Sequence, residues 1–423
     1  MGQTMTSRER LLAAIRHEEP DHVPLWSQCY GFAPPRSMRW ERAGREVAHW
    51  YSMRLELDDH TLPEPWGTDD DFERVQRWLR LGVDDILEAS PPWSPHPAVR
   101  IRDWQAPAGG EERYPLLGRA YETPAGVLEH IVRRTDEQPS PGWVVQPDHV
   151  PLFEDFNVGR AVRPAVQGAD DLAKLRYLLG EPSPAQLEAY RARMARVQAF
   201  AAAQGVLVQG WSAYGMDGIV QLMGAERAVV AAMTEPDFFQ ELVDMMAAFD
   251  RARTEIMLAT GGVDMVVQYG WYSGTSFWSP RLFERFVLPH LQELVGLVHQ
   301  RGALFAYVMT EGVLPMAGLL LAAGIDLLYW VDPVQDAADM VVVKEKFRGR
   351  LAVAGGINSA VTLGRGSAQE IQRAVDSAVR TLGPGGGFIL SPVDALFPDT
   401  PYHAVEVMIG AWREAGRYPL AAG

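Results

Sequence analysis

From residue 205 onward, short apolar runs alternate with longer helical patterns, and this alternation constrains the fold most. The clearest unit lies within residues 303–332, where apolar runs cover 303–309 and 325–330. The segment between these runs is helical in pattern and ends at Gly324, the usual kind of residue after a helix. Continuous apolar runs are typical of strands covered on both faces. The unit therefore predicts two parallel strands joined by a helix.

Eight apolar runs have the length and composition of buried strands. They begin near residues 22, 83, 205, 263, 303, 325, 351 and 387, and helical patterns separate most of them. Eight parallel strands that alternate with helices close into a TIM (β/α)8 barrel. The sequence therefore predicts an α/β chain of this class, with residues 1–423 forming a single domain.

Residues 90–165 interrupt the alternation. Prolines and tryptophans are scattered through this segment, and ETPAGVLEHIV, from residue 122, has the pattern of a turn that leads into a strand. We interpret residues 90–165 as an insertion with short strands after the second barrel strand. We expect it to pack on the barrel rather than to fold alone.

Composition and charge exclude several kinds of partner. The formal net charge is -15 and no stripe of lysine and arginine offsets it, which argues against nucleic acid because phosphate would be repelled. No apolar run approaches the roughly 18 residues of a membrane span, and the first residues do not resemble a signal peptide. We therefore expect a cytoplasmic protein. Cys29 is the single cysteine, which excludes an internal disulfide and a zinc site built from several thiolates.

Aromatic and acidic residues collect where the predicted strands end. In parallel α/β folds, ligands bind at this carboxyl edge of the sheet. An edge with many rings, a few acids and almost no bases suits an aromatic or apolar ligand, or a quaternary amine held by cation–π contacts. Each ring can equally be a core residue, and Glu311 can equally belong to a helix cap. The candidates are Trp26, Trp211, Tyr214, Tyr269, Trp271, Tyr272, Tyr307 and Trp330, with the acids Asp85, Asp217, Glu311, Asp332 and Asp394.

Two adjacent acids, Asp84 and Asp85, stand in the predicted strand at 83–88. Neighbouring side chains of a strand point to opposite faces, so we expect one of the two to face the interior. A buried carboxylate is costly unless it is paired. The inward residue is therefore a candidate for function.

Five collinear segments resemble the uroporphyrinogen decarboxylase superfamily. They are RERLLAAIRHEEPDHVPLW, DDIL in the second strand, SPRLFERFVLPHLQELVGLVHQRGA, LAVAGGIN, and GPGGGFIL followed by PDTPYHAV. The resemblance covers nearly the whole chain and implies a homodimer. It also implies either a porphyrinogen decarboxylase or a methyltransferase that exchanges a methyl group with a corrinoid. By this resemblance, Asp85 holds the position of the family's catalytic aspartate.

The residues that bind a porphyrinogen in the family's decarboxylases are partly replaced. Those decarboxylases resemble this chain except that they carry an arginine cluster after the first strand and a histidine near the last. Here Cys29 and Asp394 stand at two of these positions, and Arg36 and Arg39 are the arginines that remain. Because several carboxylates need cations, this loss of positive charge disfavours a porphyrinogen as substrate.

The methyltransferase branch resembles this chain at TPAG, residues 123–126. Members that methylate thiols bind zinc through an HxCG-type motif, whose two ligand positions are Val308 and Thr310 here. We therefore expect no thiolate zinc site and no thiol acceptor. Zinc accepts carboxylate and histidine ligands as well, so a metal stays open. No clear ligand set is formed by Glu311, Asp332 and Asp394.

The favoured hypothesis is a methyltransferase or demethylase for a small O-methylated or N-methylated substrate, with an aromatic ring in the first case. By resemblance, a partner protein would carry cobalamin, the corrinoid that accepts the methyl group. Glu311, Asp394 or Tyr307 would donate a proton to the leaving group. A carboxyl group that is buried among rings has a raised pKa and stays protonated near neutral pH.

Two alternatives come from other functional classes. A decarboxylase of a porphyrinogen or of a smaller acid would use Asp85 to stabilise a protonated intermediate, and Arg36 or Arg39 to bind the carboxylate. A non-catalytic ligand-binding barrel would keep the rings and need none of the acids.

Overall fold

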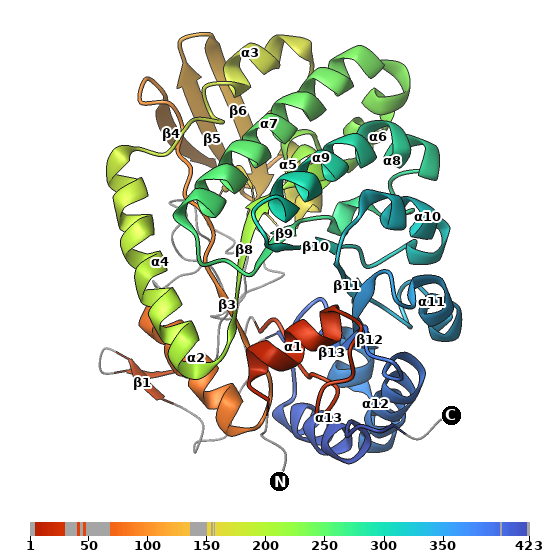
Figure 1. Cartoon of the computed structure of the whole chain (residues 1–423). Helices are drawn as coiled ribbons and strands as arrows, with labels where there is room; N and C mark the ends of the chain where they lie inside the picture. The colour runs from red at the N-terminus through yellow and green to blue at the C-terminus, as the bar shows by residue number, and fades with distance from the viewer. Residues whose placement is uncertain are drawn as a thin grey trace.

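One curved sheet of parallel strands forms the centre of the molecule (Figure 1). The computed structural model describes residues 5–29, 40–42, 45–47, 68–135, 150–153, 155, 157–397 and 400–420. Within these residues the sheet has seven strands in the order β13-β12-β11-β10-β9-β8-β3. Their bounds are β3 Ile86–Glu88, β8 Leu207–Ala213, β9 Met265–Gln268, β10 Leu304–Val308, β11 Leu327–Val331, β12 Ala352–Asn358 and β13 Phe388–Val393.

The segment at residues 22–29 closes the sheet into a barrel. The Leu390 amide in β13 donates to the Pro24 carbonyl at 2.9 Å, and the Trp26 amide donates to the Leu390 carbonyl at 3.1 Å. At the other edge, the Asp84 amide donates to the Leu25 carbonyl at 2.9 Å. The predicted TIM barrel is therefore confirmed. Its first strand consists of isolated bridges, because Pro24 has no N–H to contribute to a regular ladder.

Helices follow the strands and cover the outside of the barrel (Figure 1). Their apolar positions and caps explain where they form. In the last but one helix, Ile371, Val375 and Val379 are buried along one face, and Ser367 forms a capping box with Glu370. The bounds are α1 Ser7–Ile15, α2 Thr68–Arg80, α3 Leu172–Leu175, α4 Pro184–Gln204, α5 Gly215–Met223, α6 Ala225–Thr234, α7 Pro236–Thr260, α8 Pro280–Phe286, α9 Leu288–His299, α10 Val313–Ala323, α11 Met340–Phe347, α12 Ala368–Leu382 and α13 Tyr402–Ala415.

Helix α1 covers the amino end of the barrel. The Arg8 amide donates to the carbonyl of Gly205, just before β8, at 2.7 Å. The amide of Gly387, just before β13, donates to the Ala14 carbonyl at 2.9 Å. Helix α1 is thus fixed to the starts of two strands, so the carboxyl end is the end where a ligand site is expected.

A separate antiparallel sheet forms the insertion, at the top left of Figure 1. Its strands are β4 Arg100–Ala106, β5 Leu116–Thr123, β6 Gly126–Arg133 and β7 Ala161–Arg163, in that order. The TPAG run is the hairpin turn between β5 and β6, in which the Thr123 hydroxyl donates to the Gly126 carbonyl at 2.7 Å. Gly126 has a φ of 124°, which favours glycine. The hairpin turn therefore explains the TPAG sequence without any partner protein.

The remaining elements are short. Strands β1 (Trp40–Arg42) and β2 (Arg45–Val47) pair in antiparallel fashion. Single turns of helix occur at η2 (Val158–Arg160), η3 (Ala169–Asp171), η4 (Trp271–Ser273) and η5 (Ser359–Leu363). None of the helices that the structure describes is both long and apolar enough to cross a membrane.

Candidate functional site

Six aromatic rings at the carboxyl end of the barrel contact one another, and we call them the ring cluster. Ring centroids are 5.1 Å apart for Trp26 and Tyr329, 4.9 Å for Trp211 and Tyr269, and 5.4 Å for Trp271 and Trp330. The structure thus brings together five rings that the sequence places at this rim, and it adds Tyr329. The members are Trp26, Trp211, Tyr269, Trp271, Tyr329 and Trp330.

Irregular register lets neighbouring residues of one strand enter the ring cluster. Tyr329 and Trp330 are consecutive, yet both contact Trp26, at 5.1 and 6.2 Å between centroids. The pairing of β11 with β12 shifts between Tyr329 and Val331. Such a bulge re-aims side chains that would otherwise alternate between faces. This is why Tyr329 belongs to the site although strict alternation does not predict it.

Tyr214 connects the ring cluster to a residue of the insertion segment 90–165. Its ring stacks on Tyr269, with 5.3 Å between centroids, and on Phe153, with 4.5 Å. The Arg253 guanidinium lies 4.6 Å from the centroid of the Tyr214 ring. Tyr214 therefore acts as a packing residue beside the cluster.

Asp394 accepts a hydrogen bond from an indole of the ring cluster. It follows β13, and the indole Nε1 of Trp271 donates to its Oδ1 at 2.5 Å. The pKa of Asp394 is raised to about 6, mainly by burial; the hydrogen bond from Trp271 lowers this pKa, and the charge of Asp332 raises it. Its backbone has a φ of 75°, a left-handed conformation that non-glycine residues rarely adopt and that is concentrated at functional sites.

Asp217, in the first turn of α5, holds the loop that carries Trp271. It accepts hydrogen bonds from the backbone amides of Trp271, at 3.1 Å, and Tyr272, at 2.9 Å. Burial raises the pKa of Asp217 to about 7, and the nearby charge of Asp394 acts in the same direction. The two acids therefore share one region and influence each other's protonation.

Asp332 completes a group of three acids at this rim. It follows β11, is fully buried, and accepts hydrogen bonds from the Asn358 side chain and from the Val334 amide, both at 2.7 Å. Among the residues that the structure describes, no arginine, lysine or histidine forms an ion pair with Asp217, Asp332 or Asp394. The part of the rim that the structure describes is therefore acidic and offers no cation for a carboxylate-rich ligand.

Asp84 and Asp85 are buried acids of a different kind. Asp84 accepts from Arg10 of α1 at 2.5 Å, and Asp85 accepts from Arg74 of α2 at 2.5 and 2.7 Å. Both acids precede β3, which begins at Ile86, so they lie at the amino end of the barrel. The two side chains do point to different partners, but both are fully buried and paired. The structure does not bring Asp85 to the rim where Asp394 lies.

The other two expected proton donors also lie apart from Asp394. The Tyr307 ring contacts Phe283 of α8, with 6.4 Å between centroids, and its hydroxyl lies beside Ser273. Burial raises the pKa of Tyr307, and the charge of Asp217 acts in the same direction. The Glu311 carboxylate accepts hydrogen bonds from Ser276 and Gln335. Within the described residues, neither Tyr307 nor Glu311 has a ring contact or a hydrogen bond with a member of the ring cluster. Arg36 and Arg39 lie outside the described residues.

Glu88 is a site residue that sequence reasoning missed. It stands at the carboxyl end of β3, where its Oε1 accepts from Trp211 Nε1 at 3.2 Å and from Gln209 Nε2 at 3.1 Å. The Tyr329 hydroxyl donates to Gln209 Oε1 at 3.1 Å. These bonds link a buried polar chain to the ring cluster. In the sequence, Glu88 is recognisable only as an acid at the end of a short apolar run. Asp84 and Asp85, two adjacent acids in the same run, are the more conspicuous candidates.

No metal-binding group is evident in the part of the chain that the structure describes. There, no three histidine, cysteine, aspartate or glutamate side chains lie close enough together to hold a metal ion. Glu311, Asp332 and Asp394 do not form such a group.

A closed parallel barrel with rings and acids gathered at the carboxyl ends of its strands defines an α/β-barrel protein of the kind that binds small molecules there. Residues 183–415 match the family model described as Uroporphyrinogen decarboxylase (URO-D). The match covers more than half of the chain, so the chain belongs to the uroporphyrinogen decarboxylase family, a family of enzymes. No curated protein matches the chain.

Solved structures show the same fold at low sequence identity. A methyltransferase from Methanosarcina mazei is 16% identical, with a TM-score of 0.56, over 97% of this chain and 99% of that one. A B12-independent methionine synthase from Shewanella sp. W3-18-1, in complex with selenomethionine, is 11% identical, with a TM-score of 0.47, over 93% of this chain and 96% of that one. The likeness to the Methanosarcina protein supports the barrel fold.

Proposed function

We propose that this protein removes a methyl group from an oxygen or nitrogen atom of a small, mostly aromatic substrate and passes it to a corrinoid on a partner protein. The observation that carries the proposal is the environment of Asp394. This buried acid has a raised pKa, is oriented by the Trp271 indole, and has no basic partner among the described residues. The Methanosarcina mazei relative is a methyltransferase of the same fold, which agrees with the proposal.

The ring cluster and the rim acids favour an uncharged or cationic substrate over a polyanion. Aromatic faces bind aromatic rings and methylated ammonium groups. Anionic groups would meet Asp217, Asp332 and Asp394, which increases the cost of removing them from water. This charge pattern also disfavours the decarboxylase alternative, whose proposed aspartate, Asp85, is bound to Arg74 at the other end of the barrel.

Asp394 is suited to donate the proton that the leaving oxygen or nitrogen atom needs. With a pKa of about 6, its carboxyl group is half protonated near pH 6 and roughly a tenth protonated at pH 7. The Trp271 indole donates a hydrogen bond to one oxygen of the Asp394 carboxyl group, and the other oxygen is left for a ligand. The corrinoid of the partner would supply the nucleophile for the methyl carbon. The described residues fit this division of roles, since they provide rings to orient the substrate and an acid to protonate it.

The proposal is tested with 2-methoxyphenol as substrate and cob(I)alamin as methyl acceptor. We expect the protein to release catechol, measured by chromatography, in proportion to enzyme concentration. A parallel assay with N-methylated amines tests the second substrate class. The proposal fails if neither class is demethylated, and release of carbon dioxide from aromatic acids would support the decarboxylase alternative instead. Homodimerisation and the single-domain organisation stay predictions.

Replacing Trp271 with phenylalanine is expected to extend activity to higher pH. The hydrogen bond from Trp271 lowers the pKa of Asp394, so its removal raises that pKa. The protonated acid is the active form, so the rate falls as pH rises through the pKa, and the fall moves upward in the variant. The control is Trp104→Phe, which removes an indole that donates to Glu129 at 3.1 Å in the insertion. An unchanged pH profile in Trp271→Phe would show that Asp394 is not the group whose titration controls the rate.

A further inference from the structure

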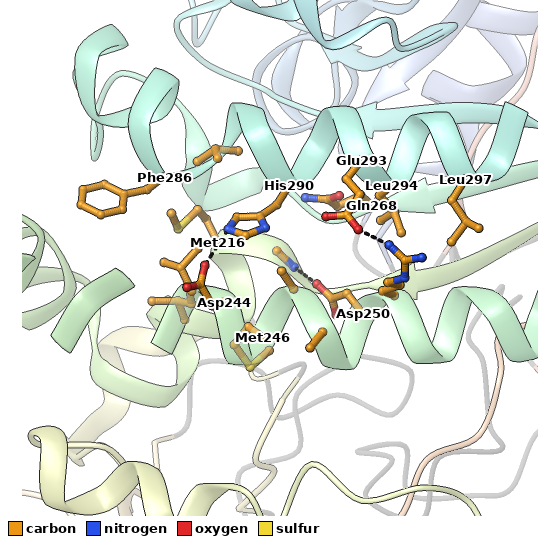
Figure 2. A pocket seen from close by; sticks show the side chains of 17 residues that line it. Met216, Asp244, Met246, Asp250, Gln268, Phe286, His290, Glu293, Leu294 and Leu297 are labelled. Atoms are coloured by element: carbon orange, nitrogen blue, oxygen red, sulfur yellow. Dashed lines mark hydrogen bonds and ion pairs between the residues drawn. The ribbon is translucent and has the colours of Figure 1, made fainter. Parts of the chain in front are cut away.

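A cavity lies outside the barrel, between helices α7 and α9 and over the start of α5 (Figure 2). Its volume is about 230 Å³. Most of its lining is aliphatic or sulfur-containing, with Met216, Ile219, Val243, Met246, Leu294 and Leu297 among the lining residues. The cavity is therefore suited to an apolar molecule. No member of the ring cluster lines it.

Ionisable residues of the pocket pair with one another across its two helices. The His290 ring of α9 lies 3.0 Å from the Asp244 carboxylate of α7, and Arg251 of α7 pairs with Glu293 of α9. Figure 2 shows both pairs spanning the space between the helices. Asp250 is occupied as well, because it accepts from the amides of Tyr214 and Gly215, at 2.9 and 2.8 Å. An occupant therefore does not need to bring a charge.

One polar side chain of the pocket, that of Gln268, is not paired in this way. Gln268, the last residue of β9, lines the pocket with only 6% of its surface exposed. Within the described chain its carboxamide forms no hydrogen bond. A Cβ on Gly215, whose φ is 52°, would lie 2.5 Å from the Gln268 Nε2 atom, so glycine leaves the space that this amide occupies. The Gln268 amide atoms are not among the fully enclosed unpartnered atoms of the described chain, so the amide is open to the pocket and can pair with a polar group of an occupant.

The size and charge of the pocket define the chemical class of its occupant. A cavity of about 150 Å³ in another protein holds benzene, so this larger one has room for roughly eight to ten non-hydrogen atoms. Three acids line the pocket, Asp244, Asp250 and Glu293, against the two basic side chains of Arg251 and His290. An anion is therefore disfavoured, whereas a neutral molecule is not.

We propose that this pocket is a binding site for an uncharged, mostly apolar molecule with one hydroxyl or carbonyl group that pairs with Gln268. The site does not depend on the proposed methyl transfer. Gln268 directly precedes Tyr269 of the ring cluster, and Gly215 lies two residues before Asp217. An occupant thus contacts the two segments that position the rings and acids at the barrel rim.

Calorimetric titration with benzyl alcohol and ethylbenzene tests the site, because the two molecules have similar size and differ in the hydroxyl group. We expect saturable binding of benzyl alcohol, with ethylbenzene about tenfold weaker, as one hydrogen bond of roughly 1.4 kcal/mol implies. Gln268→Met should remove this preference while keeping both molecules bound. Ala247→Phe, which fills the pocket from α7, should abolish binding of both.

The control for the filled pocket is Ala259→Phe, at an exposed position of the same helix. It should bind both molecules as the unmodified protein does. The proposal is overturned if the unmodified protein binds neither molecule saturably, if Ala247→Phe still binds benzyl alcohol, or if Gln268→Met keeps the tenfold preference. Binding that survives in Ala247→Phe would place the molecule in the ring cluster instead.

Discussion

Replacing Asp394 with asparagine is expected to lower the rate of methyl transfer by about 10²- to 10⁴-fold, the usual contribution of a positioned general acid. The fold should persist, because asparagine tolerates the left-handed backbone that a φ of 75° requires. Its side-chain oxygen can still accept the hydrogen bond from Trp271. The loss is measured as kcat for catechol release. A variant that keeps more than a tenth of the normal rate would exclude Asp394 as the proton donor.

The same variant should show a pH-dependent gain in stability. The pKa of Asp394 is about 6 in the folded protein and near its ordinary value when unfolded, so the folded state binds more protons between these values. The stability of the unmodified protein therefore decreases as pH rises through this range. The advantage of Asp394→Asn should grow by on the order of 3 kcal/mol between pH 4 and pH 8. Asp170→Asn, at an exposed acid, is the control and should show no such change.

Replacing Arg74 with methionine is expected to lower the free energy of unfolding by about 3–5 kcal/mol. Arg74 is 1% exposed and donates to both oxygens of Asp85, which is fully buried. The substitution leaves a buried carboxylate without its cation, which is costlier than the loss of the bond itself. Urea unfolding measures the change. The control in the same helix is Arg77→Met, which removes a partly exposed pair with Glu73 and should cost about 1 kcal/mol or less.

A double variant separates a structural role of Asp85 from a catalytic one. When Arg74→Met is combined with Asp85→Leu, both charges are gone, and much of the lost stability should return. The folded double variant should also keep its methyl-transfer rate. Loss of that rate in a stable double variant would restore Asp85 as a catalytic candidate.

The barrel could be predicted from the sequence because buried parallel strands have apolar runs of characteristic length. Departures from the prediction have local causes. The sequence of residues 280–301 predicts one helix, but the structure has two, α8 and α9. They are separate because Pro289 lacks an N–H and its ring obstructs the preceding turn. Helix α5 was not predicted, since Gly215 and Gly218 weaken its helical pattern.

The candidate site could be predicted only in part. The rings were placed at the rim because parallel strands all end at the same edge. Which residue faces inward depends on register and on strand bounds, and these are fixed by tertiary pairing. Tyr307 contacts Phe283 of α8, while a register shift turns Tyr329 inward. Asp85 precedes β3 and Glu88 is its last residue. The two residues are three positions apart in the sequence, yet they lie at opposite ends of the barrel.

Helix α1 has a kinetic consequence. Since it is bonded to the starts of β8 and β13, we expect a small molecule and a protein partner to approach the barrel from the same carboxyl end. A docked partner would then block the path of the substrate. On the proposed function, the reaction has an obligatory order, in which the substrate enters before the partner docks and the demethylated product leaves only after the partner has dissociated.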